Sequence, residues 1–413
     1  MLACEELPMR PLLVILIGIS FVLSPVAALA GRPPTAPASQ PSETDRRQAF
    51  ELSRKAADFI DAQKWPEAEK TLNDSLALVP DNFVCLYNLA LVHATTGRSE
   101  AAVEDLEKAT DAGFTDFHRL LNDPAFVPLR ELPRFDRLLA RREQIRHHAA
   151  ERVLDELKAS FGQRYRYELD EAHQLALAAR IDQSALDEAA ASLRVEQQSL
   201  AEQLFSHPPD ELVRVIIASS LDFSKLEHRA DVGGHYDDAT RTILVKRPGP
   251  ELGHEYVHAL HAADQHALGQ EHPVWLSEGL ATLYEQPGYT PATQPASPRM
   301  IPADTWRLAR VQAAARQKAL IPIDKLIAMD RAAFTARADL AYGESGSLLL
   351  YLYDRQLLKK FYDAYTAGYG ADRAGAVALA AVTREALPDL QHKWVEWLLA
   401  RPVPPRSSQA ITR

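Results

Sequence analysis

The spacing of apolar residues divides the chain into a helical first part and a second part in which strands precede helices. Residues 45–140 are predicted to form paired helices, and the densely charged segment 141–160 predicts one connecting helix. The pattern then changes, because apolar and polar residues alternate over 165–169 as they do in a half-buried strand. The chain is therefore expected to carry an all-α domain followed by a domain of another class.

The second part, residues 161–400, is predicted to be an α+β domain because strand-like runs are followed by helical ones. Runs typical of strands lie at 165–169, 212–218 and 240–246. The segment 173–181 fits either a strand or a helix. Helices are predicted at 183–205 and from 251 onward, apart from a Pro-, Thr- and Ser-rich loop at 286–298 and a disordered tail at 401–413.

The helical part contains a repeat with a period of 34 residues. Residues 49–82 can be laid over 83–116 without a gap, and the matched pairs are Ala56 with Ala90, Phe59 with His93, Ala68 with Ala102, and Leu72 with Leu106. This pattern resembles the tetratricopeptide repeat, a helix–turn–helix unit of that length. The resemblance implies repeats with a helical cap over 45–140, which either bind a protein partner or serve as a structural cap on the next domain.

Residues 1–30 have the features of a secretory signal peptide. An unbroken run of apolar and small residues covers 12–23, and Ala28-Leu29-Ala30 supplies a cleavage site. Acidic residues near the start fit such a signal poorly, so Met9 is an alternative first residue, and an uncleaved anchor is the other alternative. The Pro- and Ser-rich residues 31–44 predict a flexible linker. We therefore expect a periplasmic or secreted protein that does not contact the membrane after cleavage.

Charge and cysteine content narrow the class of protein further. The formal net charge of −10 argues against a nucleic-acid partner, because such proteins carry basic surfaces. It also gives no reason to expect an anionic membrane surface as a partner. Cys4 precedes the predicted cleavage site, so the mature chain keeps Cys85 alone and cannot form an internal disulfide. Stability must therefore come from the apolar core and from any metal that the protein binds.

The strongest chemical signal in the sequence is His254-Glu255-Tyr256-Val257-His258. Residues four apart on a helix lie on one face, so the imidazoles of His254 and His258 can reach one ion. Neutral imidazole suits zinc. Glu255 would then be placed to take a proton from water bound to that metal, as a general base does.

A second element supplies a third ligand. Trp275-Leu276-Ser277-Glu278-Gly279-Leu280-Ala281 begins a predicted helix shortly after His272-Pro273, and a returning helix would bring Glu278 beside the two histidines. Three protein ligands and an open position are typical of a catalytic zinc site, whereas a structural site is closed by four ligands. Zn²⁺ is therefore the expected cofactor, held by His254, His258 and Glu278.

Other residues near the motif are weaker candidates. Asp264 has the spacing of an aspartate ligand, but position 261 is a histidine and not the glycine that the required bend needs. The helix is therefore expected to continue and to point Asp264 away from the metal. His261, His266 and His272 are expected to be solvated or to lie beside the ligands without binding the metal. Glu285 is expected on the surface.

The two motifs together resemble those of the gluzincin metallopeptidases. They are more closely similar to the peptidase MA-like proteins of bacteria, which pair them with tetratricopeptide repeats. The similarity is sharp over 254–285 and diffuse over 165–398. It implies a zincin-like fold, a bound zinc, Glu255 as general base and Glu278 as third ligand.

The chain departs from this family pattern at two points. Aminopeptidase relatives carry a G-x-M-E-N segment that holds the amino terminus of the substrate, and this segment is not found here, which favours an endopeptidase. Thermolysin-like relatives carry an aspartate four residues after the third ligand, which orients a ligand histidine. Thr282 occupies that position here, and its hydroxyl would accept the imidazole N–H more weakly than a carboxylate.

Tyr342 is a candidate for the donor that stabilises the oxyanion. Relatives often supply this donor from a Tyr or His well downstream of the third ligand. Tyr342 begins a predicted helix, 342–353, whose small residues allow close packing against the metal helices. An ordinary core aromatic is the alternative.

Two functions of different kinds follow from these patterns. The first is a zinc peptidase that hydrolyses peptides or proteins, with the strand at 240–246 offering its edge to an extended substrate. The second is an interaction or scaffold protein whose repeats bind a partner and whose peptidase domain is restrained or inactive. The intact Glu255 favours the first function, because a scaffold has no need of a base.

Overall fold

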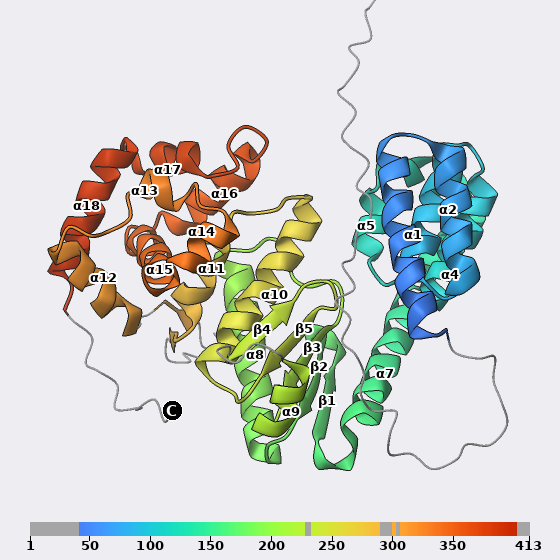
Figure 1. Ribbon diagram of the computed structural model, residues 1–413, viewed down its shortest axis with the longest axis horizontal. Coiled ribbons are helices and arrows are strands. Elements are labelled where there is room, and N and C mark those ends of the chain that lie inside the picture. The colour runs from blue at the N-terminus through green and yellow to red at the C-terminus, as the bar shows by residue number, and fades with distance from the viewer. Residues whose placement is uncertain (1–40, 228–232, 290–299, 303–305, 403–413) are drawn as a thin grey trace, which may run out of the picture. The chain divides into compact units, whose positions relative to one another are not determined.

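The structure is a computed structural model that describes residues 41–227, 233–289, 300–302 and 306–402 (Figure 1). The predicted signal peptide lies outside the described residues, as do most of the predicted linker, of the 286–298 loop and of the C-terminal tail. The chain divides into two compact units, Met1–Ser160 and Phe161–Arg413. The first unit is helical and the second combines a mixed sheet with helices, so the fold is α+β overall.

The described part of the first unit is built from helices. They are α1 Glu43–Asp61, α2 Trp65–Leu78, α3 Phe83–Thr95, α4 Ser99–Asp111, α5 Phe117–Asn122, the 3-10 helix η1 Pro124–Glu131, α6 Pro133–Ala140 and α7 Arg142–Phe161. α1 begins at a capping box, in which the Ser42 hydroxyl accepts a hydrogen bond of 3.1 Å from the backbone N–H of Asp45. α7 covers the segment in which a connecting helix is predicted.

Residues that are 34 positions apart have matching environments in this unit. The small and large apolar residues of the repeat are fully buried where α1 packs on α2 and α3 packs on α4: Ala56 and Ala90, Ala68 and Ala102, Leu72 and Leu106. The two inter-helix turns also match, because Gln63 has φ 54° and Gly97 has φ 79°. The sequence period therefore corresponds to two helix pairs with the same turn and the same packing.

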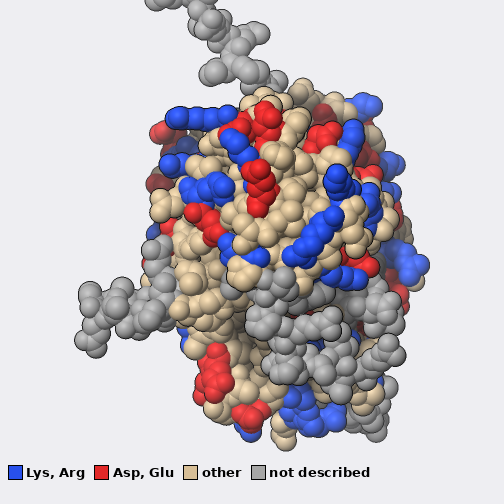
Figure 2. Space-filling view, turned by 90° about the vertical axis from the view of Figure 1, so that its left-hand side faces the viewer, with Lys and Arg blue, Asp and Glu red and all other residues tan. Residues whose placement is uncertain are grey.

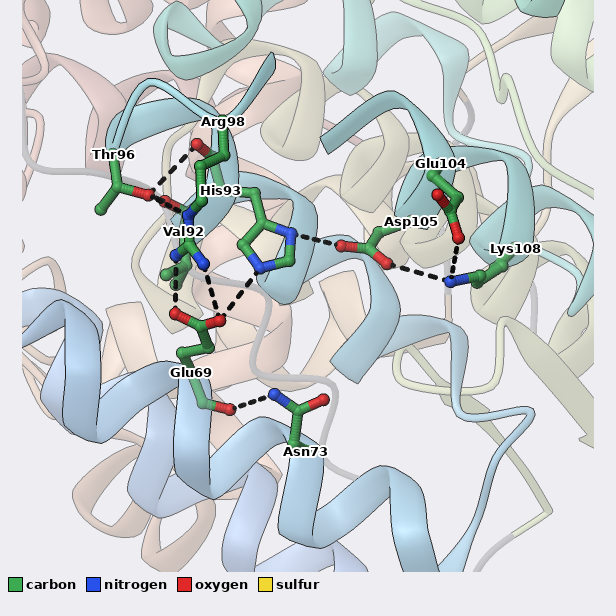
Figure 3. A network of polar contacts seen from close by, with 9 residues as sticks. All are labelled: Glu69, Asn73, Val92, His93, Thr96, Arg98, Glu104, Asp105 and Lys108. Carbon is green, nitrogen blue, oxygen red and sulfur yellow. Dashed lines mark hydrogen bonds and ion pairs between the residues drawn. The ribbon is translucent and has the colours of Figure 1, made fainter. Parts of the chain in front are cut away.

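A polar network joins α2, α3 and α4 around His93, which replaces the Phe59 of the first copy. In Figure 3 the ring lies between two carboxylates, with Nε2 3.3 Å from Glu69 and Nδ1 2.7 Å from Asp105. Arg98 donates two hydrogen bonds of 2.7 and 2.6 Å to Glu69, which lower the pKa of that carboxyl to about 2. The network therefore holds the second helix pair against the first through charged groups.

The second unit contains a five-stranded mixed sheet. Its strands are β1 Arg166–Asp170, β2 Leu175–Ala179, β3 Val213–Ile217, β4 Gly234–Asp237 and β5 Thr242–Val245, in the spatial order β1-β2-β3-β5-β4. β2, β3 and β5 run parallel, whereas β1 and β4 are antiparallel strands at the two edges. β2 is buried along its whole length, as expected of an inner strand. The ambiguous segment 173–181 is therefore a strand.

The place of β5 in the sheet contradicts the prediction that the strand at 240–246 offers an edge to a substrate. β5 pairs with β3 on one side and with β4 on the other, so its backbone groups are already bonded. β4 is the edge strand on this side of the sheet. Its four residues are too few to produce a recognisable alternation of apolar and polar positions.

Helices form most of the rest of the second unit. They are α8 Gln183–Gln203, α9 Ser220–Leu226, α10 Pro250–Leu268, α11 Val274–Tyr284, α12 Trp306–Arg316, α13 Ile323–Leu326, α14 Arg331–Ala336, α15 Ala338–Asp354, α16 Leu358–Gly368, α17 Ala376–Thr383 and α18 Leu387–Ala400. The 3-10 helices η2 Gly162–Arg164 and η3 Glu171–His173 flank β1, and β6 Gly288–Tyr289 pairs with β7 Met300–Ile301. No helix in the described ranges is long and apolar enough to cross a membrane.

Charges of both signs share the surface seen in Figure 2, which is the left-hand side of Figure 1. Lysine and arginine side chains are interspersed there with aspartate and glutamate. This mixed distribution is that of an ordinary solvated surface.

The packing of α11 on α15 depends on two glycines. A Cβ at Gly279 would lie 2.9 Å from Leu349 Cδ1 and 3.0 Å from Ser345 Cβ. A Cβ at Gly346 would lie 2.7 Å from Thr282 Cγ2. The two helices therefore approach so closely that neither position leaves space for a side chain, and the position of α11 is fixed by α15.

Replacing Gly279 by valine should therefore destabilise the protein. Because the added atoms meet packed neighbours, we expect the free energy of unfolding in urea to fall by about 1–3 kcal/mol. Gly368→Val is the control, because no heavy atom lies within 4 Å of a Cβ there. If both variants unfold at the same urea concentration as the wild type, the close α11–α15 contact is absent.

Candidate metal centre

The two histidines of the motif lie one turn apart on α10. The helix begins with Pro250, which suits a first helical position, and ends at Gly269, whose φ of 63° is left-handed. The rings of His254 and His258 have centroids 4.9 Å apart, and their Nε2 atoms are 3.3 Å apart. Two imidazole nitrogens are therefore directed at the same place.

Glu278 on α11 brings a third atom to this place. Its Oε2 lies 3.5 Å from Nε2 of His254 and 3.2 Å from Nε2 of His258. The carboxylate is buried, with 6% of the residue exposed. The structure thus brings together the three residues that the sequence predicts as metal ligands, and this group could hold a metal ion.

The spacing of the three atoms suits a single ion. Zinc bonds imidazole nitrogen and carboxylate oxygen at about 2.0–2.2 Å in a tetrahedral arrangement, which separates neighbouring ligand atoms by about 3.3–3.5 Å. The three separations here are 3.3, 3.5 and 3.2 Å. Lone pairs that converge in this way repel one another unless positive charge lies between them. The residues present therefore fit a divalent cation, and imidazole with carboxylate suits several metals.

The electrostatics of the cluster also favour positive charge between the ligands. Burial acts to lower the pKa of His254, but hydrogen bonds with Glu278 and Glu285 raise it to about 9. Burial acts to raise the pKa of Glu278, but His254 and His258 hold it well below its ordinary value. The raised pKa favours the protonated, positively charged form of His254, and a metal ion would displace that proton.

The outer nitrogens of both histidines have partners as well. Nδ1 of His254 lies 3.6 Å from Oε2 of Glu285, and Nδ1 of His258 lies 3.3 Å from the hydroxyl of Ser277. Nε of Arg307 in turn lies 3.1 Å from Glu285. Such partners fix the orientation of a ligand ring and which of its nitrogens carries the proton.

Two predictions about these partners are wrong. Glu285 does not lie on the surface, because only 6% of it is exposed and it contacts His254. Thr282 faces Gly346 of α15, and its hydroxyl has no hydrogen-bond partner in the described part of the chain. Glu285 follows Glu278 by seven residues, or two helical turns, and this spacing could have revealed it.

Asp264 lies outside the ligand cluster and has a structural role. Its carboxylate accepts hydrogen bonds of 3.0 and 2.9 Å from the backbone N–H groups of Ser206 and His207, and one of 2.7 Å from the hydroxyl of Tyr362. These bonds connect α10 with the segment after α8 and with α16. α10 runs on past Asp264 to Leu268, so the carboxylate is held away from His254 and His258.

The other histidines near the motif are not alike. His261 and His272 are buried and form a pair, with Nε2 and Nδ1 2.7 Å apart. Of the two alternatives expected for them, solvated side chains are therefore wrong, and a place beside the ligands without metal binding stays a prediction. His266 is exposed and its Nε2 lies 3.0 Å from Asp238.

Glu255 lies beside the cluster and next to the edge strand. A Cβ at Gly234 of β4 would lie 3.5 Å from Cγ of Glu255. The negative charge of Glu255 also contributes to the raised pKa of His254 and of Tyr342, after larger causes. No hydrogen bond connects this carboxylate with another described residue.

The ring of Tyr342 lies near the ring of His254. It belongs to the second turn of α15, because the helix begins at Ala338 and not at Tyr342 as predicted. Its ring centroid is 6.3 Å from that of His254 and 5.2 Å from that of Phe334. Burial, and then the charge of Glu278, raise the pKa of the hydroxyl to about 12. The hydroxyl therefore stays protonated at neutral pH and can donate a hydrogen bond.

Besides Arg307, two further charged residues near the cluster were not identified from the sequence. Nη1 of Arg331 lies 3.3 Å from Oε1 of Glu278. Glu196 of α8 lies against α10, where its Oε2 would be 3.7 Å from a Cβ at Gly253. Burial raises the pKa of this carboxyl well above its ordinary value. Neither residue follows a motif, because each reaches the site through tertiary packing.

A scan against protein-family models and searches of curated proteins and solved structures found no match for this chain. A function therefore has to be inferred from the chemistry of the site.

Glu285→Gln should weaken zinc binding about 10–100-fold, because the residue that orients His254 loses its charge. Competition with a chromogenic chelator measures the affinity. Asp264→Asn is the control, since it alters a carboxylate of α10, the helix of His254, that does not face the ligands, and it should leave the zinc affinity unchanged. A larger loss in Asp264→Asn than in Glu285→Gln would contradict this geometry.

Proposed function

We propose that residues 161–400 form a zinc-dependent peptidase domain of the gluzincin, peptidase MA-like type, with a zincin-like fold. The observation that carries this proposal is the convergence of His254, His258 and Glu278, with Glu255 beside them. Two imidazoles and one carboxylate are a donor set of catalytic zinc sites. The described residues offer no fourth protein ligand in this group, which leaves a position for water or substrate.

In this proposal Glu255 is the general base. Zinc in a site of this kind lowers the pKa of a bound water to about 7 and polarises a carbonyl oxygen. Glu255 accepts a proton from the attacking water and delivers it to the leaving amine. Its position next to the ligands and the absence of a hydrogen bond to another described residue support this role.

Tyr342 is proposed to stabilise the oxyanion that forms when water attacks the carbonyl. A donor for this purpose must be protonated and free to point at the developing charge. The raised pKa of Tyr342 satisfies the first condition. Its hydroxyl makes no hydrogen bond with another described residue, which satisfies the second.

The substrate is proposed to be an extended peptide segment that pairs with β4. Among the described strands β4 is bonded to β5 on one side only, so its other edge can accept a further strand. Gly234 at the start of β4 lies against Glu255, so a peptide on this edge would pass close to the base. This arrangement suits cleavage within a chain, that is, endopeptidase activity.

The helix pairs of the first unit are proposed to be tetratricopeptide repeats that bind a protein partner, with α5, η1 and α6 as the cap. The matching turns and buried residues 34 positions apart support this assignment. We further propose that the protein is exported to the bacterial periplasm or secreted, with neither nucleic acid nor membrane as a partner after cleavage.

Glu255→Gln should retain zinc and lose activity. Glu255 is not a ligand, so the metal content should equal that of the wild type, while turnover of a peptide library should fall at least about 10²-fold. Glu251→Gln, one turn earlier on the same helix, is the matched control and should keep both properties. Unchanged turnover in Glu255→Gln would exclude this mechanism. If the wild type also lacks turnover, a scaffold function of the repeats becomes the better account.

Tyr342→Phe should lower kcat about 10²–10³-fold with little change in KM, because the lost donor acts only on the transition state. Zinc content and melting temperature should stay at their wild-type values. A variant with normal kcat and a lower melting temperature would show that Tyr342 is a core aromatic.

A further inference from the structure

Arg331 is an exposed cation in direct contact with a proposed metal ligand. It is the first residue of α14, and its Nη1 lies 3.3 Å from Oε1 of Glu278. Oε2 of the same carboxylate faces the two histidines. The side chain of Arg331 is nevertheless 73% exposed. Its guanidinium group therefore borders the ligand cluster and is open to solvent.

The backbone that carries Arg331 is held in place. Asp330 caps α14 by accepting a hydrogen bond of 2.7 Å from the backbone N–H of Ala333. Phe334 on the same short helix is fully buried and packs against the ring of Tyr342. The position of Arg331 beside the site is therefore a consequence of the fold.

The contact with Glu278 does not by itself explain this arginine. Only one of the five guanidinium N–H groups takes part in it, and an ion pair with so exposed a partner contributes little to stability. A positive charge next to a metal ligand also opposes the binding of a cation at that ligand. Arg331 thus carries an electrostatic cost for the metal site and leaves most of its donors unused.

The charge of the site shows what those donors could bind. Three carboxylates, Glu255, Glu278 and Glu285, and two guanidinium groups, Arg307 and Arg331, surround the ligand cluster. Burial raises the pKa of Glu196 well above its ordinary value, which favours the neutral form of this carboxyl. These five groups sum to one negative charge, and a divalent ion would turn the sum into one positive charge. The loaded site should therefore attract an anion.

We propose that Arg331 binds a carboxylate of the substrate and so makes the peptidase selective for peptides with an acidic side chain close to the scissile bond. A free carboxyl end would present the same group, and the probes below distinguish the two sources. The planar guanidinium group suits this role, because it can donate two parallel hydrogen bonds to one carboxylate. The inference rests on the proposed peptidase function.

Binding of small probes to the zinc-loaded protein tests the proposal without turnover. N-acetyl-glutamate should bind at least about 10-fold more tightly than N-acetylglutaminamide, which has no carboxylate, as measured by calorimetry. N-acetylglutamine and the α-amide of N-acetyl-glutamate each keep one carboxylate, so they distinguish a chain end from an acidic side chain. Arg331→Gln should abolish the preference and Arg331→Lys should keep part of it.

Arg310→Gln is the matched control, because Arg310 is an exposed arginine paired with Asp339 on the surface. It should behave as the wild type. A preference for carboxylates that is unchanged in Arg331→Gln, at equal zinc content, would overturn the proposal, because the metal alone would then account for it.

Peptide turnover separates this inference from the peptidase function on which it rests. If the wild type hydrolyses peptides with equal kcat/KM for Glu- and Gln-containing pairs and for free and amidated ends, the role of Arg331 is wrong and the peptidase function stands. If Arg331 governs binding of the probes but no peptide is hydrolysed, the carboxylate site stands and the peptidase function is wrong.

Discussion

The convergence of two imidazole nitrogens and one carboxylate oxygen on a single point is the constraint on which the second unit depends. His254 and His258 come from one helix and Glu278 from the next, so α10 and α11 must keep a fixed register. A slip of α11 by one turn would move Glu278 by about 5.4 Å and empty the site. Three polar groups that face one another in a largely buried place are costly unless positive charge compensates them, so the register and a cation bound there would stabilise each other.

The surrounding packing holds this register from several sides. Gly279 and Gly346 let α11 lie directly on α15, and Asp264 attaches α10 to α16 through Tyr362. Arg307 connects Glu285, the partner of His254, with the proposed oxyanion donor. It contacts Glu285, and its guanidinium carbon lies 5.3 Å from the ring centre of Tyr342. One connected set of contacts therefore positions the proposed metal ligands and the proposed oxyanion donor.

The core of this site could be predicted from the sequence because its chemistry has local spacing on single helices. His254, Glu255 and His258 share α10, so their spacing places both imidazoles on one face of that helix. Glu278 lies within α11, and the resemblance to the metallopeptidase motifs points to it. The inner position of β5 could not be predicted, because strand order depends on pairing between distant segments and β4 is too short to recognise. The contacts of Arg331 and Arg307 with the site depend on tertiary packing of α14 and α12 against α11, which no local pattern encodes. Glu285 does have a local signal, its spacing of two helical turns from Glu278.

The central claim is that one ion lies between these three side chains, and X-ray absorption at the zinc edge tests it most directly. The account predicts one zinc per chain with only nitrogen and oxygen neighbours at about 2.0–2.2 Å, including the outer scattering of two imidazole rings. The signal should be lost in Glu278→Ala. A sulfur neighbour, three or more imidazoles, or an unchanged spectrum in Glu278→Ala would place the metal elsewhere and contradict the account.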